Sequence, residues 1–158
     1  MLRRILPLLF AVVFAASAQT EKYDGPVPPK PDLPYIKQAD NLIPTEALEA
    51  KEEKGKKNAT TYIIAGANSP ARTPLAEPTF IIRVDKLNPD QLSLYKLESR
   101  NGQREIVFEP KHPPQAHRVD VTRLSGGLYK IEVDDTLDPG EYSLSPEGSN
   151  QVFCFQVF

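Results

Sequence analysis

Two histidines are the first side chains in this sequence that could bind a metal. His112 and His117 flank Pro113-Pro114 within one short segment, and imidazole nitrogens are common ligands of zinc and copper. The two prolines favour an extended backbone, which separates the imidazole rings. Because few other metal-binding side chains lie nearby, we interpret the segment as a solvent-exposed connector and expect no metal and no other cofactor.

The only cysteine, Cys154, is a candidate nucleophile or dimer-forming thiol. It lies in the apolar run Val152-Phe153-Cys154-Phe155, and both histidines are in a different segment. Because a reactive thiol needs a base or a positive field beside it, we expect Cys154 to be a buried strand residue. Whether it is free or paired with another chain stays open at this stage. One cysteine cannot form an internal disulfide, so the fold must depend on its apolar core.

Acidic residues offer two further kinds of chemistry. Residues 132–138 carry closely spaced carboxylates of the kind that calcium binds, but their spacing fits no EF-hand. Calcium binding by this stretch stays open. A glycosidase needs two facing carboxylates, and four glutamates could supply them: Glu98, Glu105, Glu109 and Glu132. No serine-hydrolase or zinc-protease motif is present, so we expect no catalytic residues and keep a carboxylate-dependent hydrolase as an alternative.

Sugar binding without catalysis usually relies on flat aromatic side chains. The chain has no Trp, and most of its Phe residues fall at positions that the strand pattern assigns to the core. The sequence therefore disfavours, without excluding, a sugar-binding module.

The segment 66–78 is the strongest candidate for a binding loop. It spans thirteen residues between two expected strands, and most loops in compact domains are only about 4–6 residues long. Four polar side chains could contact a protein partner: Asn68, Ser69, Arg72 and Thr73. Three prolines also occur in it, so an irregular structural crossover is the competing interpretation.

The first residues have the pattern of a secretory signal peptide. Arg3 and Arg4 give a positive start, an apolar run follows, and Ala16-Ser17-Ala18 has the small residues that precede a cleavage site. The apolar run is shorter than the ~20 residues of a spanning helix. We therefore expect residues 1–18 to be removed near Ala18, giving a secreted or periplasmic protein with no membrane span in its mature chain.

Residues 19–59 are expected to form a Pro-rich arm. Five of the sixteen residues in 19–34 are proline, which favours a stiff, extended spacer. Helix-forming residues after Thr45 predict a short helix near 46–54. Small apolar clusters at Tyr35-Ile36 and Leu42-Ile43 could pack on the following domain.

Residues 60–158 alternate short apolar runs with turns and are predicted to be all-β. We predict eight strands, at 61–65, 79–84, 91–97, 104–109, 117–124, 128–133, 140–145 and 151–157. Asn101-Gly102 is typical of a tight hairpin. No helix separates these runs, so we expect an antiparallel two-sheet sandwich of seven to eight strands. The last strand has apolar residues on both faces, so either the protein covers both or one meets a partner.

One corner of the sequence resembles a known superfold. Leu137-Asp138-Pro139-Gly140-Glu141-Tyr142 is similar to the entry into the penultimate strand of immunoglobulin-like and fibronectin-III-like modules. The resemblance implies an immunoglobulin-like sandwich and implies no particular function. The chain lacks the Trp and the paired cysteines of antibody-type domains.

Charge narrows the range of partners. The chain has 19 Lys and Arg against 21 Asp and Glu, with no basic block, so we expect no nucleic-acid partner. We expect a non-catalytic secreted module that binds or scaffolds a protein at the bacterial envelope or exterior. A subunit of a fibre or secretion assembly that pairs through strand edges is a further alternative. The sequence does not indicate the oligomeric state.

Overall fold

A computed structural model describes residues 19–158 of the chain, so the expected signal peptide lies outside the described residues. The described part is all-β with antiparallel sheets and contains no α-helix. Three short 3₁₀ turns occur, at Lys56–Asn58, Pro89–Gln91 and Ser125–Gly127. No helix in residues 19–158 has the length and apolar character needed to cross a bilayer.

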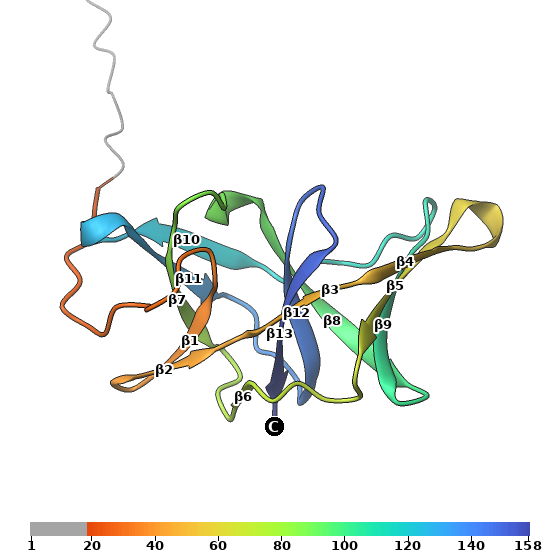
Figure 1. Cartoon of the computed structure of the whole chain (residues 1–158), viewed down its shortest axis with the longest axis horizontal. Coiled ribbons are helices and arrows are strands. Elements are labelled where there is room, and N and C mark those ends of the chain that lie inside the picture. Colours follow the sequence, from red (N-terminus) through yellow and green to blue (C-terminus); the bar gives the residue numbers. More distant parts are fainter. Residues whose placement is uncertain (1–18) are drawn as a thin grey trace, which may run out of the picture.

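A five-stranded sheet forms one end of the molecule (Figure 1). Its strand order is β10-β11-β7-β1-β2, and every neighbouring pair is antiparallel. The strands are β1 (Tyr35–Gln38), β2 (Asn41–Pro44), β7 (Thr79–Arg83), β10 (Val119–Arg123) and β11 (Leu128–Val133).

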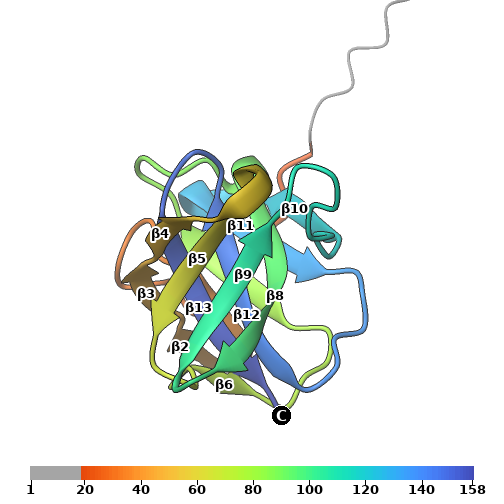
Figure 2. The same ribbon diagram turned by 90° about the vertical axis from the view of Figure 1, so that its right-hand side faces the viewer.

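The second sheet is larger and curls into a half-barrel. Its order is β3-β13-β12-β8-β9-β5-β4, with β6 added in parallel beside β13. The strands are β3 (Glu46–Glu49), β4 (Lys51–Lys54), β5 (Thr60–Ala65), β6 (Arg72–Thr73), β8 (Leu92–Arg100), β9 (Gln103–Phe108), β12 (Gly140–Pro146) and β13 (Gln151–Val157). Figure 2 shows β5 and β9 lying in front of β12 and β13, which makes this curvature visible.

The two edges of the curled sheet are joined by one short piece of chain. β3 pairs with β13 at one edge and β4 pairs with β5 at the other, and only Ala50 separates the two strands. Ala50 is buried and its N–H donates to the carbonyl oxygen of Asn150 at 2.7 Å. The chain from 46 to 54 therefore bridges both edges and holds the sheet in its curved form.

The helix expected near 46–54 is therefore wrong, because these residues form β3 and β4. Their helix propensity is worth only tenths of a kcal/mol per residue, whereas the strands gain backbone pairing with β13 and β5 and bury Ala50. The expected count of seven to eight strands is also too low, since residues 19–158 form thirteen. All eight predicted strands are present, and the additional ones are short.

The main core lies between the two sheets. β8, β12 and β13 form the middle of the curled sheet, and one face of them packs against β1, β7 and β11. Its fully buried members include Ile36, Phe80 and Ile131 on one side and Leu94, Leu144, Phe153 and Phe155 on the other. The opposite face of the same strands points into the half-barrel, where Leu97, Val152 and Cys154 are buried with Ile64 and Ala50. Both faces of β13 are thus covered within the protein.

The first part of the N-terminal arm, residues 19–34, packs against the five-stranded sheet. Glu21 exchanges backbone hydrogen bonds with Arg123 and Ser125, and Tyr23 packs on a cluster of Ile81, Leu124 and Leu128. Asp32 fastens the arm further along, where it accepts hydrogen bonds from three backbone N–H groups. The segment predicted as a spacer is thus fastened to the domain at Glu21, Tyr23 and Asp32.

The corner that resembles immunoglobulin-like modules has one hydrogen bond typical of them. The Tyr142 hydroxyl donates to the carbonyl oxygen of Asp138 at 2.7 Å, four residues upstream, as in a tyrosine corner. This geometry is local. The sheet order with a half-barrel does not confirm an immunoglobulin-like sandwich.

Candidate functional site

The segment 66–78 is mainly a structural crossover. Ser69 and Thr73 are buried, and the Ser69 hydroxyl donates to the carbonyl oxygen of Cys154 at 3.2 Å. Arg72 and Thr73 form β6 beside β13. Of the four side chains predicted to meet a partner, only Asn68 and Arg72 are exposed. The exposed Arg72 also has partners within the protein, since it bonds Gln156 and lies over the Phe158 ring.

The histidines and the acidic stretch have local partners. His117 lies 3.5 Å from Asp135 and packs edge-on against Tyr142, while His112 is exposed beside Glu109. Asp135 accepts from the backbone and side chain of Arg118, and these bonds hold the pKa of its carboxyl below the usual value. Within the described residues, no three His, Cys, Asp or Glu side chains converge as metal ligands would.

Only two of the four candidate glutamates come together. Glu98 and Glu105 are directly paired between β8 and β9, and Arg100 lies between them, 3.2 Å from Glu98 and 3.4 Å from Glu105. Both carboxylates are thus paired with the same guanidinium, and the three side chains form an ion-pair cluster across β8 and β9. None of the four glutamates lines the pocket described next.

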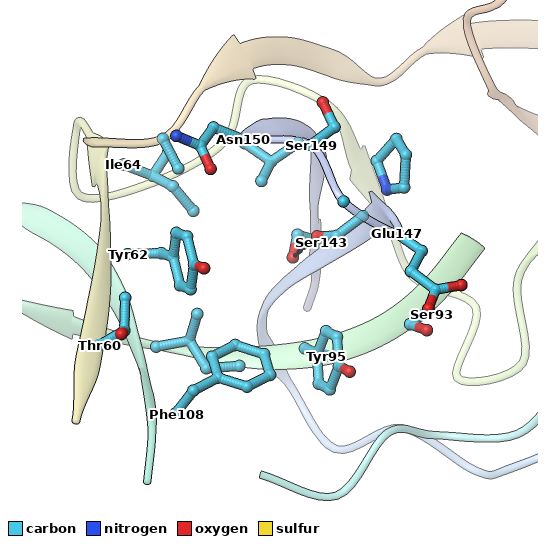
Figure 3. Close-up of a pocket in the computed structure, with 16 residues that line it drawn as sticks. Thr60, Tyr62, Ile64, Ser93, Tyr95, Phe108, Ser143, Glu147, Ser149 and Asn150 are labelled. Atoms are coloured by element: carbon cyan, nitrogen blue, oxygen red, sulfur yellow. Dashed lines mark hydrogen bonds between the residues drawn. The ribbon is translucent and has the colours of Figure 1, made fainter. Parts of the chain in front are cut away.

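A pocket occupies the open end of the half-barrel (Figure 3). It has a volume of about 390 Å³, within the ~300–1,000 Å³ range of small-molecule sites. Residues from β5, β8, β9, β12 and β13, together with Ala50 and the turn between β12 and β13, line it. The side chains come from alternate positions along each strand, because successive residues point to opposite faces of a sheet.

Three aromatic rings form one side of this pocket. Phe108 packs edge-on against Tyr62, with ring centroids 5.5 Å apart and an interplanar angle of 89°. Tyr95 packs against Phe108 in the same manner, at 5.3 Å and 79°. All three are only partly buried, unlike Phe80 and Phe155 of the main core, which are fully buried. The rings therefore keep accessible surface toward the cavity.

Ser and Thr hydroxyl groups line much of the remaining wall of the pocket. Ser93 on β8 is directly opposite Ser145 on β12 in the strand pairing. The hydroxyl oxygens of Ser143 and Ser145 are hydrogen-bonded to each other at 3.1 Å. Figure 3 shows Ser143 on the side of the cavity opposite Tyr62. Thr60 on β5 and Ser149 on the turn bring the lining to five hydroxyl-bearing Ser and Thr side chains.

The turn between β12 and β13 forms the rim. Gly148, with φ of +69°, allows the chain to reverse there, and the N–H of Glu147 donates to the carbonyl oxygen of Gln91 at 3.0 Å. Glu147 is exposed, and among residues 19–158 it is the only charged one in the lining, to which they contribute no Lys, Arg, His or Cys. Lys54 donates to Thr60 from outside the lining and is itself paired with Glu52 at 2.6 Å.

A buried charge cluster fills another part of the half-barrel interior. Arg104 is fully buried and donates to the carbonyl oxygens of Ala65 and Gly66 and to Glu46 at 2.7 Å. Glu141 lies 3.6 Å from the same guanidinium. Burial raises the pKa of Glu141 and outweighs the lowering effects of the Ser69 N–H and Arg104. All the hydrogen-bonding atoms of Arg104 point at protein groups, so this cluster closes the half-barrel and offers no site.

Sequence reasoning missed the pocket. Its signal was polar and aromatic residues alternating with core residues on predicted strands: Ser93 and Tyr95 beside Leu92 and Leu94, and Ser143 and Ser145 beside Leu144. That alternation shows a second, less apolar face. Which strands the curled sheet places opposite one another is not encoded in any local pattern, so the convergence of these faces was not predictable.

Comparisons of the chain with protein-family models, with curated proteins and with solved structures found no match in any of the three.

Proposed function

We propose that this chain is an exported, non-catalytic binding module that holds a group of its partner in the half-barrel pocket. The observation that carries the proposal is the composition of the lining. Three aromatic rings, two of them tyrosines, and five Ser and Thr hydroxyls can bind a ligand, while the single carboxylate of Glu147 has no second acid, imidazole or thiol beside it in that lining. Acid–base and nucleophilic catalysis need paired groups within hydrogen-bond reach.

The pocket is also held in shape before any ligand binds. The Ala50 to Asn150 and Glu147 to Gln91 backbone bonds fix the rim, and three of the lining strands, β8, β12 and β13, are buried on their other face by the main core. A preformed site loses less conformational entropy on binding. This arrangement supports recognition by a largely rigid surface.

Export is part of the proposal and rests on the N-terminal pattern of residues 1–18. Fractionation of the producing cells should place the protein in the periplasm or the medium, and mass spectrometry should find a chain that begins near Gln19. A cytoplasmic protein that retains Arg3 and Arg4 would contradict export.

The binding role can be tested by photo-crosslinking in the producing cells. A photoreactive residue in place of Asn150, at the pocket rim, should give a discrete adduct under light. The same residue in place of Asp120, an exposed position on β10, serves as the matched control. Adducts at both positions, or at neither, would argue against a pocket-mediated partner.

The immunoglobulin-like arrangement adds nothing to this assignment. It stays a prediction supported by the Tyr142–Asp138 hydrogen bond at one corner, and such folds host many unrelated functions.

A further inference from the structure

The pocket has two chemically different halves. Tyr62, Tyr95 and Phe108 form an aromatic half, whereas Ser93, Ser143 and Ser145 form a hydroxyl half. A ligand that fills the cavity must therefore present an apolar surface to one half and hydrogen-bonding groups to the other. An all-apolar ligand would cover Ser93 and the mutually bonded Ser143–Ser145 pair without satisfying their remaining hydrogen-bonding capacity, which is unfavourable.

The hydrogen-bonding groups of the lining can both donate and accept. A hydroxyl supplies one donor and two acceptor sites, and the Asn150 amide supplies both kinds as well. Groups of this type match ligand hydroxyls, which also donate and accept. A sugar ring combines such hydroxyls at its edge with an apolar C–H face that packs on an aromatic ring.

Charge restricts the ligand further. The lining has no cationic side chain, and its only charged group is the carboxylate of Glu147. Lys54 donates to Thr60 from outside the lining and is paired with Glu52 at 2.6 Å. Phosphate, sulfate and carboxylate ligands would therefore lack the charge-assisted hydrogen bonds that usually hold them. A neutral ligand avoids this loss.

The volume suits a ring of this kind. An apolar cavity of ~150 Å³ holds one benzene molecule, and this pocket, at about 390 Å³, is more than twice that size. It therefore accommodates a six-membered ring together with its substituents. Because the pocket is open at the rim formed by the β12–β13 turn, a glycan chain can continue outward from the bound ring.

From these observations we infer that the pocket is a carbohydrate-binding site for a neutral sugar ring. The inference rests on the proposed function and names its ligand class. Because the chain has no Trp, an aromatic stacking surface was difficult to predict from the sequence. The aromatic half of the pocket supplies one. The serines and Asn150 bind the ring hydroxyls, and Glu147 accepts hydrogen bonds at the rim.

The test is titration calorimetry of the full processed chain, with amide NMR shifts as a second readout. The probes are neutral oligosaccharides of hexoses and N-acetylhexosamines, a matched uronic-acid oligomer and tetramethylammonium chloride. Neutral sugars should bind, should shift the amides of Ser143 and Ser145, and should bind at least tenfold more tightly than the uronic-acid oligomer. Tighter binding of tetramethylammonium would mean that the rings form a cation site and would overturn the inference.

Variants separate the two halves of the pocket. Phe108→Ala should weaken sugar binding about tenfold or more, and Phe108→Leu keeps the volume in case the alanine variant folds poorly. Ser143→Ala should weaken binding about two- to tenfold, the usual value of one hydrogen bond. The controls are Phe158→Ala and Ser99→Ala, an exposed aromatic and an exposed hydroxyl outside the lining, and both should bind normally. Unchanged binding in both Phe108 variants would overturn the inference.

The outcome also distinguishes this inference from the proposed function. If no neutral sugar binds but crosslinking from position 150 still gives a discrete adduct, only the ligand class is wrong. If sugars do not bind and the crosslink is also absent, both the ligand class and the proposed binding role of the pocket are wrong.

Discussion

At the scale of single residues, Cys154 shows how the fold removes reactivity. Its side chain is fully buried inside the half-barrel beside Ile64 and Val152, and burial raises the pKa of its thiol to about 12, against the opposing effect of Arg104. The thiolate is the reactive form of cysteine. A rise of three pKa units lowers the fraction of thiolate at neutral pH about a thousandfold. Cys154 therefore has a packing role.

The expected result is a folded protein that does not react with a thiol reagent such as Ellman's reagent at pH 7. Unfolding in urea should restore the reaction rate of a free cysteine, which should be at least about a hundredfold faster than the rate in the native protein. Cys154→Ser is the blank for the assay. Rapid labelling of the native chain would show that the half-barrel opens readily.

Asp32 is a second residue whose role the sequence did not indicate. Its carboxylate accepts from the backbone N–H groups of Asp85, Lys86 and Leu87 at 2.8, 3.0 and 3.0 Å. Partial burial raises the pKa of Asp32, but these three bonds and the charge of Lys86 outweigh it, so the pKa lies below its usual value. The ionised form is thus favoured by folding, and it fastens the arm to the turn after β7.

Asp32→Ala should lower the free energy of unfolding by about 1–2 kcal/mol at pH 7, because three backbone donors lose their acceptor. A carboxyl group whose pKa is lower in the folded protein than in the unfolded chain stabilises the fold at pH values above its unfolded pKa, which is near 4. This stabilisation is lost as the pH falls through the folded pKa. The difference between wild type and variant should therefore shrink below pH 4 in urea titrations. Asp32→Asn tolerates the positive φ of 55° and should be less destabilising. A pH-independent difference would contradict this role.

At the scale of elements, the contrast between residues 46–54 and the eight predicted strands shows what sequence patterns capture. β11 alternates large apolar residues with polar ones, and β13 is apolar on both faces, so the burial of these strands was predictable. In β3 the inward positions are Glu46 and Leu48, followed by Ala50, which is a weak apolar signal. Their partners are supplied by distant segments, Arg104 for Glu46 and Asn150 for Ala50. Long-range pairing overrode local helix propensity there.

Arg104 connects the elements that close the half-barrel. From β9 it bonds the end of β5 and Glu46 of β3, and it lies 3.6 Å from Glu141 of β12. Arg104→Met should lower the free energy of unfolding by about 3–5 kcal/mol, because the buried Glu141 and the half-buried Glu46 would both lose their cation. Chemical denaturation measures this change. A loss below about 1 kcal/mol would show that the cluster is not what closes the sheet.

Glu141→Gln tests the same cluster in the opposite direction. The raised pKa of Glu141 means that the fold favours its protonated form. Protonation of Glu141 therefore stabilises the fold at pH values below the ordinary glutamate pKa, and this contribution is lost as the pH rises through the pKa of Glu141 in the folded protein. Glutamine imitates the protonated form. The variant should therefore gain stability relative to wild type between pH 4 and pH 7, and Glu98→Gln, at an exposed position of β8, is the matched control.

At the scale of the whole molecule, two cores share one set of strands. β8, β12 and β13 place Leu94, Leu144 and Phe155 in the core between the sheets and Leu97, Ser143 and Cys154 in the half-barrel. Neither core can lose its packing without loosening the strands of the other. The pocket, which the inner faces of these strands line, therefore depends on residues that never touch a ligand.

This sharing predicts one cooperative unfolding transition. Phe155 is fully buried and packs on Phe80 at 5.0 Å and Tyr142 at 5.7 Å, so Phe155→Ala should lower the free energy of unfolding by about 3–5 kcal/mol. Hydrogen exchange should speed up equally at Ile131 in the five-stranded sheet and at Ile64 in the half-barrel. Phe158→Ala, at an exposed ring three residues further on, should change stability by less than about 0.5 kcal/mol. Exchange that accelerates in only one sheet would show two independent units, and the pocket would then be a property of the half-barrel alone.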